Sequence, residues 1–466
     1  MKKKFLAVLL TLAMVAATFS GCSSKEKSDT TSDNSTSTEA TNTAPAEEVT
    51  LTFTYKQAAS DDALEKWLNE KDVIKRFEEE NPGVNIELVP ISSSEGDYAT
   101  LLALQLSSEK TAPDIFMEDT YMTATDAAAG YLACLDDYLA DWDDYDHYLA
   151  GTKEAVKGID GKSYGVPIST DSRGIFYNID VLKKAGVETP WQPKTWEDVL
   201  DTARKIKESG QEVDPLYLIV GSSNGEGVSM QTFEMLLYGT GDQMYEDNKW
   251  LVDSKSILDS FNFISTVYQK EGLGVALDVA LATDAGNQVH KGIADGTVGM
   301  MLTVATSAGN WADTGSYPID DVESKVGFAA MPTQNGGDPA TVTMTGGWSW
   351  AISEYCKNKD LAFKFLAFCG NQENATYRSL YDGRMSPRDD STDNEKYASR
   401  PYINEMTQFM ANSYVRPKSE SYAMVSTQIQ TIVEEVASGS LTPEQAAEEY
   451  KTRVSAIVGE ENTFTK

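Results

Sequence analysis

The stretch Gly158–Leu200 reads GIDGKSYGVPISTDSRGIFYNIDVLKKAGVETPWQPKTWEDVL and shows how the chain is organised. It predicts a turn at Asp160-Gly161 and then an extended apolar segment, which Pro167 keeps from becoming a central strand. Residues 169–173 form a polar interruption, after which Ile175-Phe176-Tyr177 resumes as a buried strand. The stretch therefore predicts two extended segments joined by a short polar connection.

Two helix starts follow within the same stretch. Asn178-Ile179-Asp180 opens the first helix. Thr195 begins the second, because its hydroxyl can accept from backbone N–H groups while Asp198, three residues on, reaches back. The apolar positions that follow keep helical spacing: Trp196, Val199, Leu200, Ala203 and Ile206. Strands that alternate with helices predict an α/β fold with helices on both faces of a sheet.

The order of short motifs in this stretch carries a resemblance. The motifs are Gly161-Lys162, Tyr164–Pro167, Tyr177-Asn178, Ala185-Gly186 and Pro193–Glu197. In this order they resemble extracellular solute-binding protein family 1, the carbohydrate-binding lipoproteins of ABC transporters, which includes the maltose-binding protein. The resemblance implies a two-lobe, periplasmic-binding-protein-like (type II) fold with a hinge and a ligand cleft between the lobes.

The resemblance extends over about residues 49 to 459. It includes Ala112–Phe116 leading to Glu118-Asp119, and Gly346–Ile352 before an apolar helix. It implies a first lobe of residues 49–166 and 340–405 and a second lobe of residues 167–339 and 406–466. The chain is expected to cross between the lobes near Pro167, near 334–339 and near 404–415.

The N-terminus predicts export and lipid anchoring. Met1–Lys4 is basic, Phe5–Phe19 is apolar but short for a membrane span, and Ser20-Gly21-Cys22 is a small-residue cleavage site. Residues 1–21 are therefore expected to be a lipoprotein signal peptide, with Cys22 the lipidated residue on the extracytoplasmic face of the cell membrane. Residues 22–48 are rich in Ser and Thr and predict a disordered tether. Ordinary secretion, with Cys22 incidental, is the alternative.

The charge balance limits the partners. The 466 residues include 72 acidic and 39 basic side chains, for a formal net charge of −33. This excess of negative charge argues against nucleic acid or an anionic membrane surface as a partner. The family resemblance implies a carbohydrate and the subunits of an ABC transporter as partners, and we expect a monomer.

Three cysteines follow Cys22, namely Cys134, Cys356 and Cys369. Cys356 and Cys369 flank a predicted helix that rises roughly 20 Å between them, so a direct bridge is not expected. All three are interpreted as small buried apolar residues.

The chain offers little sign of a metal or cofactor site. Its two histidines, His147 and His290, are far apart in the sequence and predict neither a zinc cluster nor a catalytic triad. The acidic run 136–146 lacks the glycine and terminal glutamate of a calcium loop and is interpreted as a solvated face. We expect no metal and no cofactor.

A sugar site needs polar groups for the hydroxyls and aromatic rings for the apolar face of the sugar. The resemblance implies Asp119 as an acidic ligand, with Glu118 as its substitute, and Asp171 with Arg173 in the polar interruption. A solvent-facing carboxylate at Asp119 and a purely structural Asp171–Arg173 pair are the alternatives.

Aromatic candidates come from the second half of the chain. The resemblance implies Trp311 as a stacking residue. Trp348 and Trp350 are expected to face opposite ways, with Trp348 toward the cleft. Weaker candidates for ligand contact are Gln57, Asn224, Glu226, Arg388 and Tyr422.

These expectations lead to one functional hypothesis and two rivals. The protein is expected to capture a mono- or oligosaccharide between two lobes and to deliver it to an ABC permease, which a cytoplasmic ATPase drives. No nucleotide-binding loop is recognisable in the sequence. A binding protein for a non-sugar solute is the first rival. An exported glycoside hydrolase, suggested by Asp119 and Asp171 as paired acids, is the second.

Overall fold

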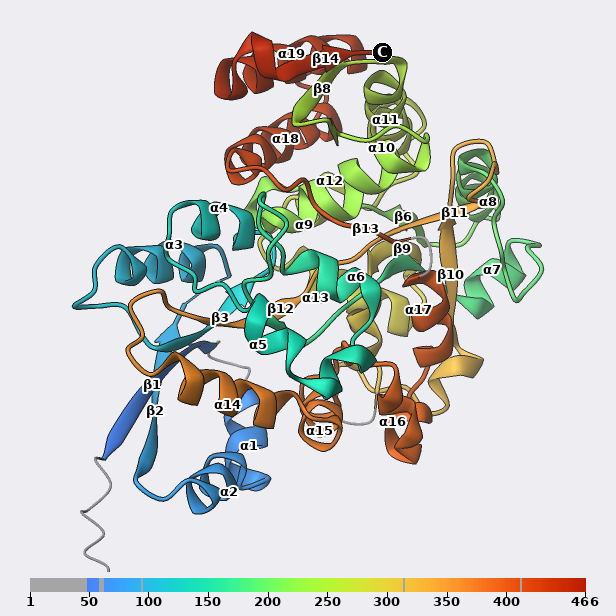
Figure 1. Cartoon of the computed structure of the whole chain (residues 1–466). Coiled ribbons are helices and arrows are strands. Elements are labelled where there is room, and N and C mark those ends of the chain that lie inside the picture. The colour runs from blue at the N-terminus through green and yellow to red at the C-terminus, as the bar shows by residue number, and fades with distance from the viewer. Residues whose placement is uncertain (1–47, 58–62, 94, 313–314, 411–412) are drawn as a thin grey trace, which may run out of the picture. The chain divides into compact units, whose positions relative to one another are not determined.

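The computed structural model describes residues 48–57, 63–93, 95–312, 315–410 and 413–466, and residues 47–466 form one compact unit (Figure 1). The predicted signal peptide, Cys22 and all of the predicted tether except its last residue lie outside the described residues. Within these ranges no helix combines the length and the apolar character needed to cross a membrane.

The first sheet has the strand order β2-β1-β3-β12-β4. Its strands are β1 (Val49–Gln57), β2 (Val84–Ser92), β3 (Ile115–Asp119), β4 (Val166–Pro167) and β12 (Trp348–Ile352). β1 runs parallel to β2 and β3, whereas β12 runs antiparallel to β3 and β4. β1 forms because apolar residues alternate with threonines, which buries Leu51, Phe53 and Tyr55.

The second sheet has the strand order β13-β11-β10-β5-β9-β6. Its strands are β5 (Arg173–Asn178), β6 (Asp214–Tyr217), β9 (Val298–Val304), β10 (Val326–Pro332), β11 (Thr341–Met344) and β13 (Ser413–Tyr414). β5, which the sequence predicts as a buried strand, is buried along its whole length between β9 and β10. A small third sheet joins β7 (Tyr245–Glu246), β8 (Lys249–Asp253) and β14 (Thr463–Thr465).

Helices surround these sheets. The α-helices are α1 (Ala63–Glu70), α2 (Val73–Glu80), α3 (Glu95–Leu106), α4 (Thr123–Ala128), α5 (Asp136–Ala140), α6 (Ala150–Ala155), α7 (Ile179–Lys184), α8 (Trp196–Glu208), α9 (Glu226–Val228), α10 (Met235–Gly239), α11 (Lys255–Ser265), α12 (Leu277–Ala280), α13 (Ala285–Asp295), α14 (Lys359–Gly370), α15 (Gln372–Asp382), α16 (Glu395–Ala398), α17 (Ile403–Phe409), α18 (Tyr422–Ala437) and α19 (Pro443–Val458). Short 3₁₀ turns cover Asp143–His147, Ser222–Asn224, Ala305–Asn310, Val322–Ser324, Asp390–Asp393 and Glu460–Asn462, and π-helical turns cover Ser229–Glu234 and Thr266–Lys270.

The predicted helix starts are confirmed. Asn178 caps α7, because its side chain accepts from the backbone N–H of Val181 at 3.0 Å. Thr195 and Asp198 form the expected capping box at the start of α8. The capped groups are backbone N–H donors that the first turn of a helix leaves unpaired.

Two separate hydrophobic cores lie against the two larger sheets. We call each sheet with its core a lobe, the first containing β1 and the second containing β5. α2 and α14 pack on the first sheet, and α8 and α13 pack on the second (Figure 1). The chain passes from the first to the second between β4 and β5, and it returns between β11 and β12.

The sheets and cores divide the chain differently from the predicted lobe boundaries at two places. β11 follows the predicted crossing near 334–339, yet it still pairs with β10 of the second sheet. The chain therefore crosses back at Gly346-Gly347 in this structure. Tyr397 and Ile403, assigned by the prediction to the first lobe, pack in the second core.

The prediction of three buried cysteines is partly wrong. Cys356 and Cys369 are buried, but Cys134 is exposed. The reason is local, since Cys134 lies in an extended segment between the buried residues Ala133 and Leu135 and so points to the opposite side.

Candidate functional site

Polar and aromatic side chains gather at the end of the first sheet where β1 and β3 finish. Asp119 is the last residue of β3 and lies opposite Trp348, the first residue of β12. Gln57 ends β1, at the position that the β1–β3 register places level with Asp119. Ligands of such sheets bind beyond the carboxyl ends of the strands. This edge of the first sheet is therefore the first wall of the candidate site.

The two crossing segments are tied together by a buried ion pair. Arg173 pairs with Asp171, and both side chains are almost fully buried. The backbone N–H of Gly346 donates to the Asp171 carboxylate at 3.1 Å, and Arg173 donates to the Met344 carbonyl at 3.0 Å. Burial lowers the pKa of Arg173, and the Asp171 carboxylate opposes that shift. These contacts give the pair a structural role in joining the crossings.

Arg416 lies where the two lobes meet. Its Nη1 is 3.5 Å from Asp119 of the first lobe, and its Nε is 2.8 Å from Glu226 of the second. Its guanidinium also lies over the ring of Tyr121, 5.6 Å from the ring centroid. Nearby carboxylates, Asp119 first, raise the pKa of Arg416 against the opposing effect of burial. One cation therefore balances acidic groups on both sides.

On the second lobe, Glu226 is held by hydroxyl groups. Tyr422 and Ser426 of α18 donate to its two carboxylate oxygens, Ser426 at 2.5 Å. The Tyr422 hydroxyl is also 2.8 Å from Glu234, which lies in a π-helical turn, a feature found frequently at functional sites. Burial raises the pKa of Glu234 to about 8, and the charge of Glu226 adds to the effect.

A small pocket lies behind Asp119. It is lined by Tyr98, Ala99, Leu102, Glu118, Asp119, Tyr121, Met122, Asp126 and Trp348. Glu118 and Asp126 are buried and share a hydrogen bond. Burial raises the pKa of Glu118 well above its usual range and that of Asp126 to about 6. The pocket therefore encloses two acids that resist ionisation together.

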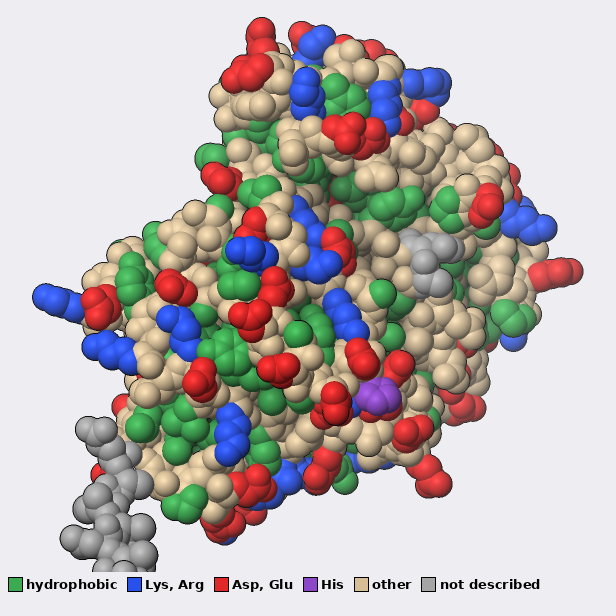
Figure 2. All heavy atoms as spheres, in the orientation of Figure 1, with side chains coloured by type: hydrophobic (Ala, Val, Ile, Leu, Met, Phe, Trp, Pro, Cys, Tyr) green, Lys and Arg blue, Asp and Glu red, His purple; other side chains and the backbone are tan. Residues whose placement is uncertain are grey.

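A larger cavity of about 610 Å³ lies beside Glu226. It is lined by Tyr121, Ile219, Ser222, Ser223, Asn224, Gly225, Glu226, Gly227, Gln231, Ala423, Ser426, Thr427 and Gln430. Its size lies within the range of small-molecule sites, and its wall mixes hydroxyl, amide, carboxylate and aromatic groups. Figure 2 shows Lys and Arg side chains gathered with Asp and Glu side chains on the face between α18 and α6.

The structure brings together most of the predicted ligand residues. Asp119, Glu118 and Trp348 line the small pocket, Asn224 and Glu226 line the larger cavity, and Tyr422 contacts Glu226. Gln57 lies at the same edge of the first sheet, where it donates to Glu65 at 2.7 Å. Their contact with a ligand stays a prediction.

Trp311 and Trp350 lie elsewhere. Trp311 has no exposed surface, packs against Phe176 and donates its indole N–H to the His290 carbonyl, so no face of its ring is open for stacking. The expectation that Trp348 and Trp350 face opposite ways is wrong. Residues two apart on a strand share a face, and both rings belong to the first core.

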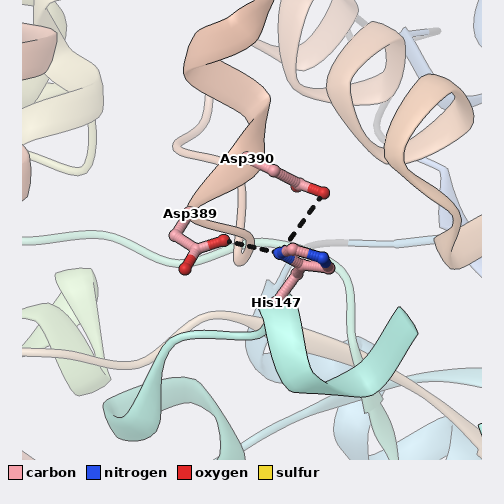
Figure 3. Close-up of side chains that lie close together, drawn as sticks. All are labelled: His147, Asp389 and Asp390. Atoms are coloured by element: carbon pink, nitrogen blue, oxygen red, sulfur yellow. Dashed lines mark hydrogen bonds and ion pairs between the residues drawn. The ribbon is translucent and has the colours of Figure 1, made fainter. Parts of the chain in front are cut away.

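Arg388 lies away from this site, in an ion-pair network with acidic residues. Its guanidinium is fully buried and bonds Asp390 at 2.6 Å and Asp144 at 2.9 Å. Asp390 also lies 3.7 Å from His147, whose Nδ1 is 3.1 Å from Asp389 (Figure 3). His147, Asp389 and Asp390 are metal-ligating residue types, but the Arg388 guanidinium already supplies a positive charge to Asp390.

Sequence reasoning missed Tyr121, Asp126, Glu234 and Arg416. Tyr121 and Asp126 follow the predicted Asp119 closely and could have been found as polar and aromatic residues after a strand end. Arg416 precedes Pro417 near the predicted crossing 404–415, which was its only signal. No local pattern marks Glu234, which stands in an apolar helical segment.

Several known proteins and solved structures are similar to this chain. The chain is 22% identical over 389 residues to a probable ABC transporter-binding protein of Deinococcus radiodurans, covering 81% of this chain and 87% of that one. A tagatose-bound ABC transporter solute-binding protein of Thermotoga lettingae superposes with a TM-score of 0.72 at 24% identity, covering 88% of this chain and all of that one.

Maltose-bound T. maritima MalE3 also superposes with a TM-score of 0.72, at 21% identity, covering 87% of this chain and 99% of that one. These likenesses confirm the predicted two-lobe α/β fold. The model of the family "Bacterial extracellular solute-binding protein" matches residues 60–376, which is more than half of the chain. The chain belongs to the bacterial extracellular solute-binding protein family.

Proposed function

We propose that this protein captures a mono- or oligosaccharide between its two lobes and delivers it to the permease of an ABC importer. The observation that carries the proposal is the convergence of groups from both lobes around Arg416. Asp119 comes from the first lobe and Glu226 from the second, and both contact the same guanidinium. Carboxylates, a guanidinium and aromatic rings are the groups that bind hydroxyls and the apolar face of a sugar.

Two solved structures with the same fold support a sugar as ligand. One of these structures contains bound tagatose and the other contains bound maltose. In this chain the cavity beside Glu226 has room for such a molecule, and Asn224 and Gln231 add amide groups to its wall. Binding would then shift the population toward the state in which both lobes contact the ligand.

The proposed transport role implies partner proteins. Family membership supports a permease in the membrane, and the proposal adds a cytoplasmic ATPase as the energy source. Cys22 is proposed as the lipid anchor that keeps the protein on the extracytoplasmic face of the membrane, as a monomer. No catalytic step is assigned to the site. A hydrolase would need two carboxyl groups facing the scissile bond, whereas Asp171 is engaged by Arg173 and Gly346.

A thermal-shift screen of the full chain tests the proposal. Mono-, di- and oligosaccharides are compared with amino acids and polyamines, which represent the non-sugar alternative. A ligand at about a thousand times its Kd adds about 4 kcal/mol to stability, which raises Tm by several degrees.

Single substitutions test whether the ligand binds at this site. Asp119→Asn and Glu226→Gln should abolish or strongly reduce the shift, because each removes a charged acceptor from the site. Asp360→Asn, on the exposed face of α14, is the matched control and should keep the shift. A shift with polyamines or amino acids and with no sugar would overturn the carbohydrate proposal.

A further inference from the structure

We propose that the small pocket formed by Glu118, Asp126 and Trp348 is a subsite for one ammonium group, so that the protein prefers an amine-bearing saccharide to its neutral counterpart. This inference rests on the proposed function and narrows it to a class of basic sugars. It concerns a part of the site that the larger cavity beside Glu226 does not include.

The pocket is built from rigid elements of the first lobe. Glu118 is in β3, Asp126 is in α4, and Trp348 starts β12, which pairs with β3. Tyr98 of α3 closes another side, and its hydroxyl donates to the Met117 carbonyl at 2.6 Å. The Tyr98 proton is therefore already used and is not available to the acids.

The two acids lack a cation. Glu118 is 1% exposed and Asp126 is 3% exposed. Within the described ranges neither lies in an ion pair with Lys or Arg. The Oε1 atom of Glu118 is buried without a hydrogen-bond partner. A buried polar atom left without a partner is costly, so the pocket is chemically incomplete without a donor.

The pocket has the right size for a single small donor. Its free volume is about 10 Å³, which is close to the space that one water-sized group needs. An ammonium group is of this size and brings three donors and a positive charge, whereas a hydroxyl brings one donor and no charge. Two acidic acceptors therefore favour the ammonium group.

The Trp348 ring already has a cation next to it. Lys56 already places its ammonium group over that ring, 5.3 Å from the centroid. The ring therefore accepts a cation in this structure, in the way that aromatic faces attract ammonium groups.

The pocket adjoins the larger cavity. Tyr121 lines both, and Asp119 stands between them as a wall of the pocket and a partner of Arg416. A saccharide that occupies the cavity can thus direct one substituent past Tyr121 toward Glu118 and Asp126. The substituent, rather than the sugar ring, enters the pocket.

The protonation of the acids agrees with this reading. Burial and mutual repulsion raise the pKa of Glu118, and Asp119 adds to the effect. Burial and mutual repulsion therefore favour retention of a proton by the pair when no cation is present. Entry of an ammonium group replaces that proton, which leaves to the solvent while the amine keeps its own.

Matched saccharide pairs test the inference on the full chain. D-glucosamine is compared with D-glucose, D-galactosamine with D-galactose, and the glucosamine β-1,4 dimer with cellobiose, by calorimetric titration and thermal shift. The amine member of at least one pair should bind about tenfold or more tightly than its neutral counterpart. Titrations in two buffers of different ionisation enthalpy should show release of up to one proton for the amine only.

Two substitutions test whether these acids cause the amine preference, namely Glu118→Gln and Asp126→Asn. Each should reduce the amine preference toward unity and abolish proton release. A purely structural role would change binding of both members equally. Asp360→Asn is the control that should leave the preference unchanged.

The outcomes separate the two proposals. Neutral sugars that bind as tightly as their amine counterparts overturn the subsite and leave the sugar-binding function intact. A preference for amines that survives in both variants also overturns it. Absence of binding by every saccharide overturns the proposed function and the subsite with it.

Discussion

Arg416 bridges acidic side chains of the two lobes. Its side chain is only 11% exposed, and the side chains of Asp119 and Glu226 are 9% and 17% exposed. Three charges with little access to water stabilise one another only while all are present. Loss of the central cation would leave two carboxylates facing each other with little solvent to screen them.

Arg416→Gln should therefore destabilise the protein by about 3 kcal/mol, because removal of one partner leaves buried charge uncompensated. Equilibrium unfolding in urea measures the effect. Lys291→Gln breaks an exposed i,i+4 pair with Asp295 on α13 and is the matched control, for which no measurable change is expected. Equal effects of the two substitutions would show that the Arg416 bridge contributes nothing in solution.

The raised pKa of Glu234 predicts how the stability of the fold depends on pH. Its pKa is raised from 4.5 to about 8, chiefly by burial. Below pH 4.5 both the folded and the unfolded states hold the proton. As pH rises from 4.5 to 8 the unfolded state ionises while the folded state stays protonated, so Glu234 progressively disfavours folding, and the cost levels off above pH 8.

Glu234→Gln removes this titration. The variant should therefore gain stability relative to the unmodified protein on going from pH 5 to pH 8, by about 2–4 kcal/mol. Thermal unfolding of both proteins at the two pH values measures the gain. A difference in Tm that is the same at pH 5 and pH 8 would mean that Glu234 does not titrate with a raised pKa.

At the scale of elements, the crossing segments position the site. The β4–β5 connection and the β11–β12 connection touch through Asp171 and the Gly346 backbone. Gly347 has φ 125, and a Cβ atom there would overlap the Ser169 carbonyl oxygen. Glycine is therefore required for the two crossings to approach each other so closely.

Gly347→Ala should lower the free energy of unfolding by about 2 kcal/mol or more, because it forces a side chain into a strained backbone conformation. It should also weaken ligand binding, because the crossing segments connect the two lobes. Gly337→Ala is the matched control, since Gly337 has no neighbour within 4 Å of an added Cβ. Urea unfolding of both variants gives the comparison. A Gly347→Ala protein as stable as Gly337→Ala would contradict the close approach.

At the scale of the whole molecule, the fold places acids, a guanidinium and aromatic rings at the meeting point of two lobes that each have their own core. The two carboxylates that contact Arg416 come from different lobes, Asp119 from the first and Glu226 from the second. A ligand that contacts both can therefore couple binding to their relative movement.

The proposed lipid anchor at Cys22 can be tested on the whole chain in the cell. Cys22→Ser should move the protein from the membrane fraction to the soluble extracytoplasmic fraction, because a lipid chain provides the predicted attachment. Fractionation followed by immunoblotting measures the shift. Cys134→Ser is the control that should stay with the membrane, and a Cys22→Ser protein that stays there too would rule out the anchor.

The sequence by itself determined the elements, the helix starts and the family. Thr195 with Asp198 and the alternating residues of β1 could be recognised because capping and strand alternation depend on neighbours a few residues away. The ordered motifs of 158–200 led to the two-lobe fold for the same reason, since they are contiguous.

Only the tertiary structure decided which side chains meet. Arg416, Asp119 and Glu226 come from three distant segments, and no local spacing relates them. The family resemblance implied Trp311 as a stacking residue, but the second core encloses its ring, so the ring is not open to a ligand. The physical reason is that ion pairing and burial depend on which surfaces the fold brings together, whereas capping and alternation depend on the chain's own neighbours.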